Sequence, residues 1–329
     1  MAKSPLNDSV LRLIDFDEDQ ANAFVAEFVQ EIFPGARFGY ACVHASGPSD
    51  KARRVFRVRV VGKGEFALKF DPQAAQSGRI EVEYNWLRSL ENHFQGYRGL
   101  GVVKPVYLAQ SNAFHVTEYV EGVPAQSIIS GAETESERVY SRAARWLSAL
   151  HDFAPARAQA FWPEWMLDAL DRVTHSAMPA AERAVYAPMI LRMHDEAEDL
   201  TGLEERKTLT HGSFAARNLL LTDTESIGLD MSTETEKLAV YDMVDFLKSD
   251  ILLDGTKSGL EPSGISSATL DSFFSNYGEN VKQDIFDYCM RGRLLIDWLK
   301  ISNQNYANSA YHRQIYDRLE ARLRAAFRG

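Results

Sequence analysis

The spacing of apolar residues changes near residue 120, and this change limits the folds that the chain can adopt. Residues 55–70 (VFRVRVVGKGEFALKF) alternate apolar and polar side chains on both sides of a Gly62–Gly64 turn, which predicts a β-hairpin. From Thr134 onwards, apolar residues mostly recur every three or four positions, as in helices. The sequence therefore predicts an α+β protein whose small β-rich N-terminal domain, residues 1–120, precedes a larger helical domain, residues 121–329.

Individual elements can be placed within this division. Helical spacing predicts one helix over Asp17–Phe33 and another over Arg79–Phe94. Two further strands are expected within residues 101–122, where an extended hinge over Thr117–Gly122 ends the β-rich part. A long helical tail is expected over Phe273–Phe327.

Charge and composition restrict the partners. The 329 residues include 46 acidic and 36 basic side chains, a formal net charge of −10. Such a balance disfavours nucleic acid and anionic membrane surfaces, and it is compatible with a neutral or cationic small molecule. The N-terminal residues lack the order of a secretory signal, and no apolar run reaches the ~18 residues that a spanning helix needs. We expect a cytoplasmic protein with no nucleic-acid or membrane partner.

Several residue types that serve phosphoryl transfer occur in a fixed order. A lysine lies near the end of a strand in FALKF (Lys69), and a glutamate lies on the next helix in EVEYNWL (Glu83). The stretch LTHGSFAARNLLL then carries Ser213 and Asn218, and an aspartate closes a strand in IGLD (Asp230). The His-Gly…Asn spacing alone is a weak pattern, so its order among the other residues carries the argument.

At this point the chain resembles the aminoglycoside phosphotransferase and choline kinase family, which has a protein-kinase-like two-lobed fold. The resemblance covers about Val55 to Lys248. HGSFAARN is similar to the family's HGDxxxxN loop, IGLD to its metal-binding strand end, and VYDMVDFL to the helix that follows. It implies an ATP- and Mg²⁺-dependent phosphotransferase that acts on the hydroxyl group of a small molecule.

The resemblance also implies a nucleotide site in the N-terminal part. Lys69 would contact the α- and β-phosphates of ATP, and Glu83 would hold its ammonium group in place. The backbone from Glu118 to Val120 would bind adenine. Without the ordered context, Lys69 and Glu83 are ordinary solvated charges.

The resemblance assigns the metal and the reacting groups to later residues. Asp230 would ligate Mg²⁺ through a carboxylate oxygen, and Asn218 would add an amide oxygen. Alternatively, Asn218 caps a turn and Asp230 begins one. Ser213 occupies the position where the family has its catalytic aspartate. Serine cannot act as a general base at neutral pH, and the loss of such a base costs ~10²–10⁴ in rate.

Three interpretations follow from Ser213. The first is a phosphotransferase for an aminoglycoside, an amino sugar or a related alcohol that uses another base or none. The second is a pseudokinase, a nucleotide-binding scaffold or regulatory protein with a protein partner. The third is an atypical transferase. We rank the enzyme first because its lysine, glutamate, asparagine and aspartate are all present. The spare carboxylates available as another base are Asp242, Asp245, Asp250 and Asp254.

Other residues have structural interpretations. We expect His211 to be a buried, hydrogen-bonded residue and His151 to belong to a helix core, and the resemblance implies that Asp242 braces the catalytic-loop backbone. Gly47 and Ser49 in ASGPSDKARR are candidates for a phosphate-covering loop or for an ordinary hairpin turn.

The acceptor is not readable from the sequence. The resemblance implies that residues 155–205 and 267–329 select it. Aromatic side chains that could stack on a sugar, or that simply belong to the core or surface, are Trp162, Trp165, Tyr186, Trp298 and Tyr306.

Overall fold

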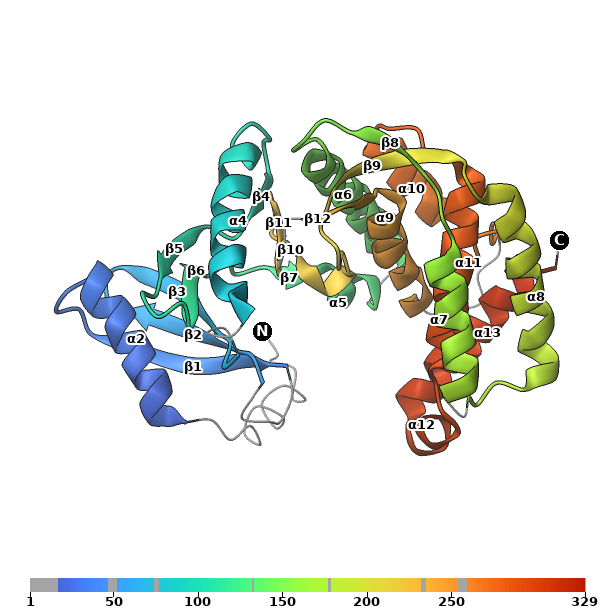
Figure 1. The fold of residues 1–329 in the computed structure, drawn as a ribbon. Coiled ribbons are helices and arrows are strands. Elements are labelled where there is room, and N and C mark those ends of the chain that lie inside the picture. Colours follow the sequence, from blue (N-terminus) through green and yellow to red (C-terminus); the bar gives the residue numbers. More distant parts are fainter. Residues whose placement is uncertain are drawn as a thin grey trace. The chain divides into compact units, whose positions relative to one another are not determined.

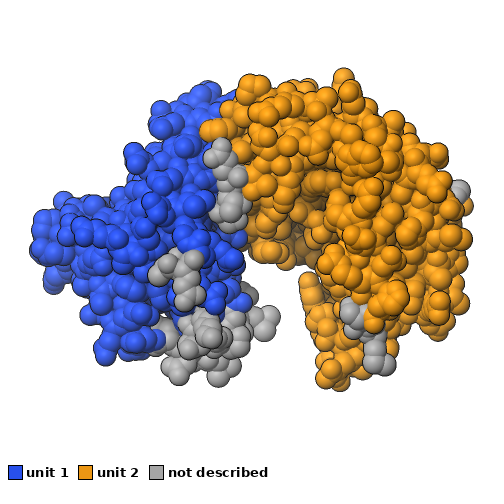
Figure 2. Space-filling view, in the orientation of Figure 1, with its two compact units in different colours: residues 1–122, 227–233 blue, residues 123–226, 234–329 orange. Residues whose placement is uncertain are grey.

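A computed structural model gives the structure of residues 17–46, 52–73, 77–131, 133–176, 179–231, 235–253 and 259–328. The chain forms two compact units (Figure 2). The first contains residues 1–122 together with residues 227–233, and the second contains residues 123–226 and 234–329. The short segment 227–233 thus belongs to the first unit although more than a hundred residues separate the two parts in sequence.

The first unit is built on a five-stranded antiparallel sheet with the order β1-β2-β3-β6-β5 (Figure 1). Its strands are β1 (Phe38–Ala45), β2 (Arg54–Val60), β3 (Gly64–Phe70), β5 (Pro105–Leu108) and β6 (Phe114–Glu118). The predicted hairpin is confirmed, because β2 and β3 pair from Arg54–Phe70 to Val60–Gly64. Its turn includes Gly62 with φ +75°, a conformation that favours glycine.

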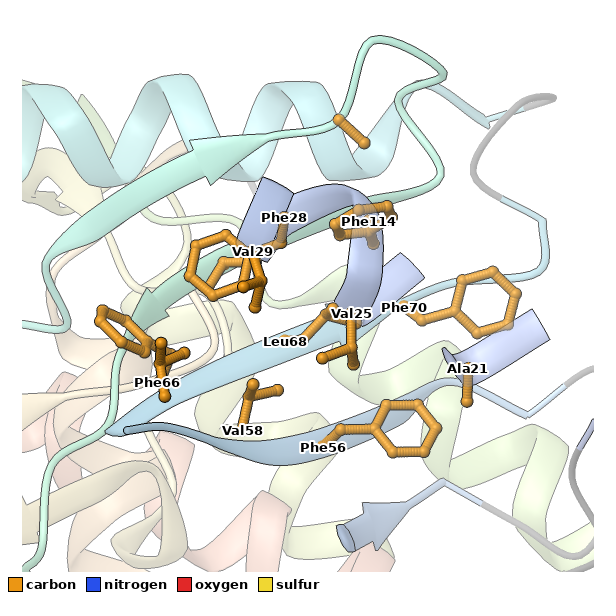
Figure 3. Close-up of a cluster of buried hydrophobic side chains, with 13 residues drawn as sticks. Ala21, Val25, Phe28, Val29, Phe56, Val58, Phe66, Leu68, Phe70 and Phe114 are labelled. Carbon is orange, nitrogen blue, oxygen red and sulfur yellow. The ribbon is translucent and has the colours of Figure 1, made fainter. Parts of the chain in front are cut away.

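Helix α2 (Glu18–Ile32) forms where helical spacing predicted a helix. It covers one face of this sheet. It begins at Asp17, whose side chain accepts a hydrogen bond from the Gln20 N–H at 3.0 Å. Figure 3 shows α2 side chains packed against side chains of β2, β3 and β6. The labelled members are Ala21, Val25, Phe28, Val29, Phe56, Val58, Phe66, Leu68, Phe70 and Phe114.

Helix α4 (Arg79–Phe94) contacts strands β5 and β6 and has the predicted bounds. Successive side chains of a strand point to opposite faces. Leu68 and Phe70 lie in the α2 cluster, so Lys69 between them faces away from α2, and its ammonium group bonds to Glu83 of α4. The short strand β4 (Leu100–Val102) follows α4.

The second unit is mainly helical. Its α11 (Gln283–Leu299) is buried along most of its length and packs against α7, α8, α9 and α13. The remaining helices are α5 (Ala125–Ile129), α6 (Glu133–His151), α7 (Glu164–Ser176), α8 (Arg183–Leu200), η1 (Ala216–Asn218), α9 (Val240–Leu247), η2 (Lys248–Leu252), α10 (Ser267–Tyr277), α12 (Asn303–Asn308) and α13 (Ala310–Ala326).

Short strands accompany these helices. Strands β8 (Arg157–Ala160), β9 (Glu204–Thr210) and β12 (Thr235–Leu238) form an antiparallel sheet with the order β12-β9-β8. Strand β10 (Leu219–Leu221) pairs with β7 (Val123–Pro124). Strand β11 (Ser226–Gly228) follows β10.

The predicted helical tail over Phe273–Phe327 is confirmed, but it is not one continuous helix. The tail is divided into α10, α11, α12 and α13. Helix α10 ends at Gly278, which has φ +81°, a left-handed conformation that stops a helix. Periodicity alone does not reveal this break, because apolar spacing resumes on the next helix.

The fold class predicted from the sequence is confirmed. A β-rich N-terminal region precedes a mainly helical region, and together they form a mixed α+β protein. Among the described residues, no helix is long and apolar enough to cross a membrane. Cys42 and Cys289 are free thiols.

Gly292 allows α11 to approach α7 closely, and this contact is testable. An added Cβ at Gly292 would lie 2.0 Å from Met166 Sδ and 3.1 Å from Met193 Cε. Met166 is itself buried, so it has little room to move. We expect Gly292→Ala to lower the free energy of unfolding by about 1–3 kcal/mol, because the clash exceeds the gain in helix propensity.

Urea denaturation measures this change. Gly39→Ala is the matched control, because an added Cβ there meets no atom within 4 Å. Equal stability of Gly292→Ala and the wild-type protein would contradict the close packing of α11 on α7.

Candidate functional site

Lys69 lies at the centre of an ion-pair cluster in the first unit. Its Nζ donates to Glu83 Oε1 and to Asp230 Oδ1, both at 2.7 Å. Lys69 lies on β3, Glu83 lies on α4, and Asp230 lies just after β11. The structure therefore brings together three of the residues that the sequence singled out.

Burial and charge act in opposite directions in this cluster. Burial lowers the pKa of Lys69, but the carboxylates of Glu83 and Asp230 outweigh it and raise the pKa overall. Burial raises the pKa of Glu83, and the neighbouring His115 and Lys69 outweigh it and lower the pKa overall. Lys69 thus stays a cation and Glu83 stays an anion at neutral pH.

Asp230 has an unusual backbone conformation with φ +57°. Aspartate and asparagine tolerate this left-handed region better than most residues, although it still costs free energy. The side chain of Asp230 is 41% exposed, whereas that of Lys69 is 14% exposed. The Asp230 side chain is therefore partly exposed to solvent while Lys69 bonds to its Oδ1.

The expected hinge follows strand β6. The Glu118 N–H donates to the Lys104 carbonyl at 2.9 Å, and the Tyr119 N–H donates to the Glu65 carbonyl at 3.0 Å. These bonds fix the backbone as it leaves β6 towards Val120. The phosphate-loop candidates Gly47 and Ser49 lie outside the described residues.

Ser213 and Asn218 lie in the second unit, on the loop between β9 and β10. The Asn218 Nδ2 donates to the Ser213 carbonyl at 2.9 Å, so the amide oxygen is the atom left for a cation. The Ser213 side chain is half-buried, and Asn218 is buried at the end of the short helix η1. No group of three or more His, Cys, Asp or Glu side chains gathers as a metal site among the described residues.

Asp242 of α9 holds the backbone of this loop. Its Oδ2 accepts from the His211 N–H at 2.6 Å, and its Oδ1 accepts from the Gly212 N–H at 3.0 Å. Asp242 is 1% exposed. The buried N–H of His211 and the partly buried N–H of Gly212 thereby gain an acceptor, and the residues that precede Ser213 are fixed.

His151 and Tyr277 extend the Asp242 network, a role that core packing did not predict for His151. His151 Nε2 lies 3.2 Å from Asp242 Oδ2, and His151 Nδ1 lies 2.6 Å from the Tyr277 hydroxyl. Since a carboxylate only accepts, Nε2 carries the hydrogen of the contact with Asp242. The sequence did not predict these bonds, because His151 lies among apolar residues at helical spacing, a pattern that indicates core packing.

Aromatic stacking also anchors the loop. The Phe214 ring stacks on Trp146 of α6, with centroids 5.1 Å apart, and on Phe246 of α9, with centroids 4.8 Å apart. His211 is buried beside Trp146 and Phe214, where the sequence analysis expected a buried residue. The backbone between His211 and Phe214 is therefore held by both polar and apolar contacts.

The spare carboxylates have other partners. Asp242 accepts the backbone bonds described above, and Asp250 is fully buried against Arg322, Ser266 and Thr269. Asp245 pairs with Arg293 at 3.2 Å, and burial raises its pKa more than Arg293 lowers it. Asp254 lies outside the described residues.

The aromatic side chains that the sequence offered for stacking on an acceptor have different environments. Trp298 is fully buried and packs on Tyr316, so it belongs to the core. Trp165 donates to the Tyr241 hydroxyl at 3.0 Å, and Tyr306 packs on Tyr316. Trp162 is 53% exposed, which leaves it the most accessible indole of these.

Comparison with protein families places the chain in a known family. A model of the phosphotransferase enzyme family, described by the abbreviation APH, matches residues 46–232, more than half of the chain. The chain belongs to the phosphotransferase enzyme family. The match spans Lys69, Glu83, Ser213, Asn218 and Asp230, and it supports a small-molecule phosphotransferase.

Solved structures share the fold. A choline kinase from Streptococcus pneumoniae is 14% identical with a TM-score of 0.58, over 93% of this chain and 99% of that chain. A macrolide 2'-phosphotransferase from Brachybacterium faecium is 15% identical with a TM-score of 0.57, over 93% and 98%. A spectinomycin phosphotransferase bound to ADP and spectinomycin is 11% identical with a TM-score of 0.58, over 93% and 94%. Comparison with curated protein sequences gives no match.

The role of Asp242 as a brace can be tested by a change of one atom. Asp242→Asn places an amide group against one of the two backbone N–H donors. We expect the free energy of unfolding to fall by about 2–4 kcal/mol, because a buried charged acceptor and its bonds are lost. Urea denaturation measures the loss.

Asp245→Asn is the matched control on the same helix. Because burial disfavours the charged form of Asp245, its neutralisation should change stability little. Equal losses for Asp242→Asn and Asp245→Asn would show that the brace is not specific.

Proposed function

We propose that this protein is an ATP- and Mg²⁺-dependent phosphotransferase whose acceptor is the hydroxyl group of a small molecule. The observation that carries the proposal is the Lys69 ammonium held between Glu83 and Asp230 at 2.7 Å from each. A lysine fixed by a buried glutamate, beside a carboxylate at a strand end, suits the binding of nucleotide phosphates with a metal ion.

The donor atoms fit magnesium. Asp230 offers a partly exposed carboxylate, and Asn218 offers an amide oxygen, and both are hard oxygen ligands. When bound, Mg²⁺ neutralises charge on the phosphate oxygens. Lys69 then orients the α- and β-phosphates, and the Glu118 carbonyl with the Val120 N–H forms the proposed adenine contact. The ADP in the spectinomycin phosphotransferase structure supports a nucleotide as the donor.

The solved structures with this fold and the net charge support the proposed acceptor class. The solved structures with this fold include enzymes named for choline, a macrolide and spectinomycin. A net charge of −10 suits a neutral or cationic acceptor such as an amino sugar, an aminoglycoside or a choline-like alcohol. We propose one of these as the hydroxyl that accepts the phosphoryl group.

Ser213 sets the expected rate of the reaction. A hydroxyl at this position can orient an acceptor by a hydrogen bond but cannot take its proton at neutral pH. Asp242 and Asp250 are committed to buried networks, and Asp245 is paired with Arg293, so none of these three is a ready substitute. Positioning and charge neutralisation therefore provide the catalysis.

The same serine favours a second function. A nucleotide-binding scaffold would keep Lys69, Glu83 and Asp230 and would need no base at position 213. In this case the second unit would present its helices to a protein partner. The two functions differ in whether phosphate is transferred, so they can be separated by experiment.

Nucleotide binding is the first test of the proposal. We expect calorimetry to show Mg²⁺-dependent ATP binding that Lys69→Ala and Asp230→Asn each weaken by about tenfold or more, because each loses a charge-assisted contact. Asp230→Asn is preferred to alanine because asparagine tolerates φ +57°. Lys63→Ala in the hairpin turn is the control, with wild-type affinity expected. Absence of nucleotide binding with any divalent metal would overturn the proposal.

The second test changes Ser213 and measures the turnover of the variants. Ser213→Asp should place a carboxylate near the acceptor hydroxyl and raise turnover by up to ~10²–10⁴. Ser213→Asn has a similar shape but no base, so it should leave turnover near the wild-type rate. Transfer of labelled γ-phosphate to aminoglycosides, amino sugars, choline-like alcohols and sugars measures both.

Each result selects one interpretation. Faster transfer by Ser213→Asp alone supports an enzyme that lacks its base. Ordinary transfer by the wild type that Ser213→Asp slows would show that another residue is the base. Confirmed nucleotide binding with no transfer by any variant would favour the scaffold.

A further inference from the structure

A buried histidine lies beside the Lys69 cluster, and none of the assignments above includes it. His115 lies on β6 and is 2% exposed. Its Nε2 is 3.7 Å from Glu83 Oε1, beyond hydrogen-bond distance but close enough for electrostatic attraction. Neither ring nitrogen has a hydrogen-bond partner among the residues that the structure describes.

The sheet places His115 directly beside Lys69. Strands β3 and β6 are antiparallel neighbours, and Lys69 is paired with His115 in their register. Phe114 and Val116 belong to the α2 cluster, so His115 between them points to the opposite face, where α4 carries Glu83. The centroid of the Tyr84 ring of α4 lies 6.2 Å from the centroid of the imidazole. His115 and Lys69 thus approach the Glu83 carboxylate from adjacent strands.

The chemistry of this position argues against simple packing. A buried imidazole without hydrogen bonds costs free energy that a leucine or methionine would avoid. The neighbouring cluster contains one cation, Lys69, and two anions, Glu83 and Asp230, so its formal charge is −1. An imidazole N–H that faces Glu83 would stabilise the carboxylate and give Glu83 a second polar neighbour while Lys69 is shared with Asp230.

We propose that His115 is a positioning residue for the nucleotide site, which holds the Glu83 carboxylate in the orientation that Lys69 requires. The inference rests on the proposed nucleotide binding by Lys69. His115 acts only through Glu83 and does not contact the reacting atoms. Because β6 continues from His115 to the hinge at Glu118, the same strand supports the proposed phosphate and adenine contacts.

A double-mutant cycle tests this inference. His115→Leu removes the imidazole but keeps an apolar side chain, and His115→Gln keeps an N–H donor. We expect His115→Leu to weaken Mg-ATP affinity roughly 2- to 10-fold, as for the loss of one polar neighbour of a carboxylate, and His115→Gln to stay closer to the wild type. In a Glu83→Gln background, His115→Leu should cause no further loss of affinity, because the carboxylate through which His115 acts is absent.

A matched histidine controls for general effects. His93 lies on α4 ten residues beyond Glu83, about 15 Å along a helix, so His93→Gln should leave affinity unchanged. Calorimetry measures affinity, and thermal unfolding shows whether each variant is folded. An equal loss for His115→Leu in the wild-type and Glu83→Gln backgrounds, or no loss in either, would overturn the inference.

A second readout does not depend on nucleotide. Two-bond ¹H–¹⁵N spectra of histidine-labelled protein report the protonation and tautomer of each imidazole, and His115→Gln assigns the signal. We expect Glu83→Gln to shift the His115 nitrogen signals and to leave those of His93 in place. Unchanged His115 signals would overturn the inference even if ATP binds. Absence of ATP binding by the wild type, with the expected shift present, would overturn the proposed function and leave the His115–Glu83 contact established.

Discussion

The rest of the proposed site depends on the ion pairs of Lys69. This one ammonium group joins a strand of the first sheet, the helix that packs on it, and a segment that returns from far along the chain. Because Lys69 and Glu83 are largely buried, each needs the other to remain charged. The cluster therefore ties the segment that contains Asp230 to the first unit. In the proposed function it also keeps a cation ready for phosphate.

In the second unit, the irregular loop that carries Ser213 is held in place by polar and aromatic contacts. A loop that turns inward leaves backbone N–H groups without partners, and Asp242 accepts two of them. Phe214 adds aromatic packing on both sides. These contacts hold the backbone around Ser213, the position at which the resemblance implies an aspartate.

The sequence predicted the parts of the site whose order along the chain is characteristic. Lys69, Glu83 and Asp230 were found because strand, helix and strand end follow each other in the family's order, and the alternating hairpin gave the fold class. Side-chain contacts between distant elements were not predictable in this way. His115 and Tyr277 sit in ordinary apolar patterns, and only the register of β6 and the packing of α10 reveal their partners.

A crystal structure with Mg²⁺ and a non-hydrolysable ATP analogue would test the central claim most directly. The claim is that Lys69, Glu83 and Asp230 form a nucleotide site. We predict that Lys69 Nζ stays within hydrogen-bond distance of Glu83 and contacts the α- or β-phosphate. Asp230 should leave Lys69 and ligate the metal together with Asn218. A complex in which the Lys69–Asp230 pair remains closed, with the nucleotide and metal bound elsewhere, would contradict the account.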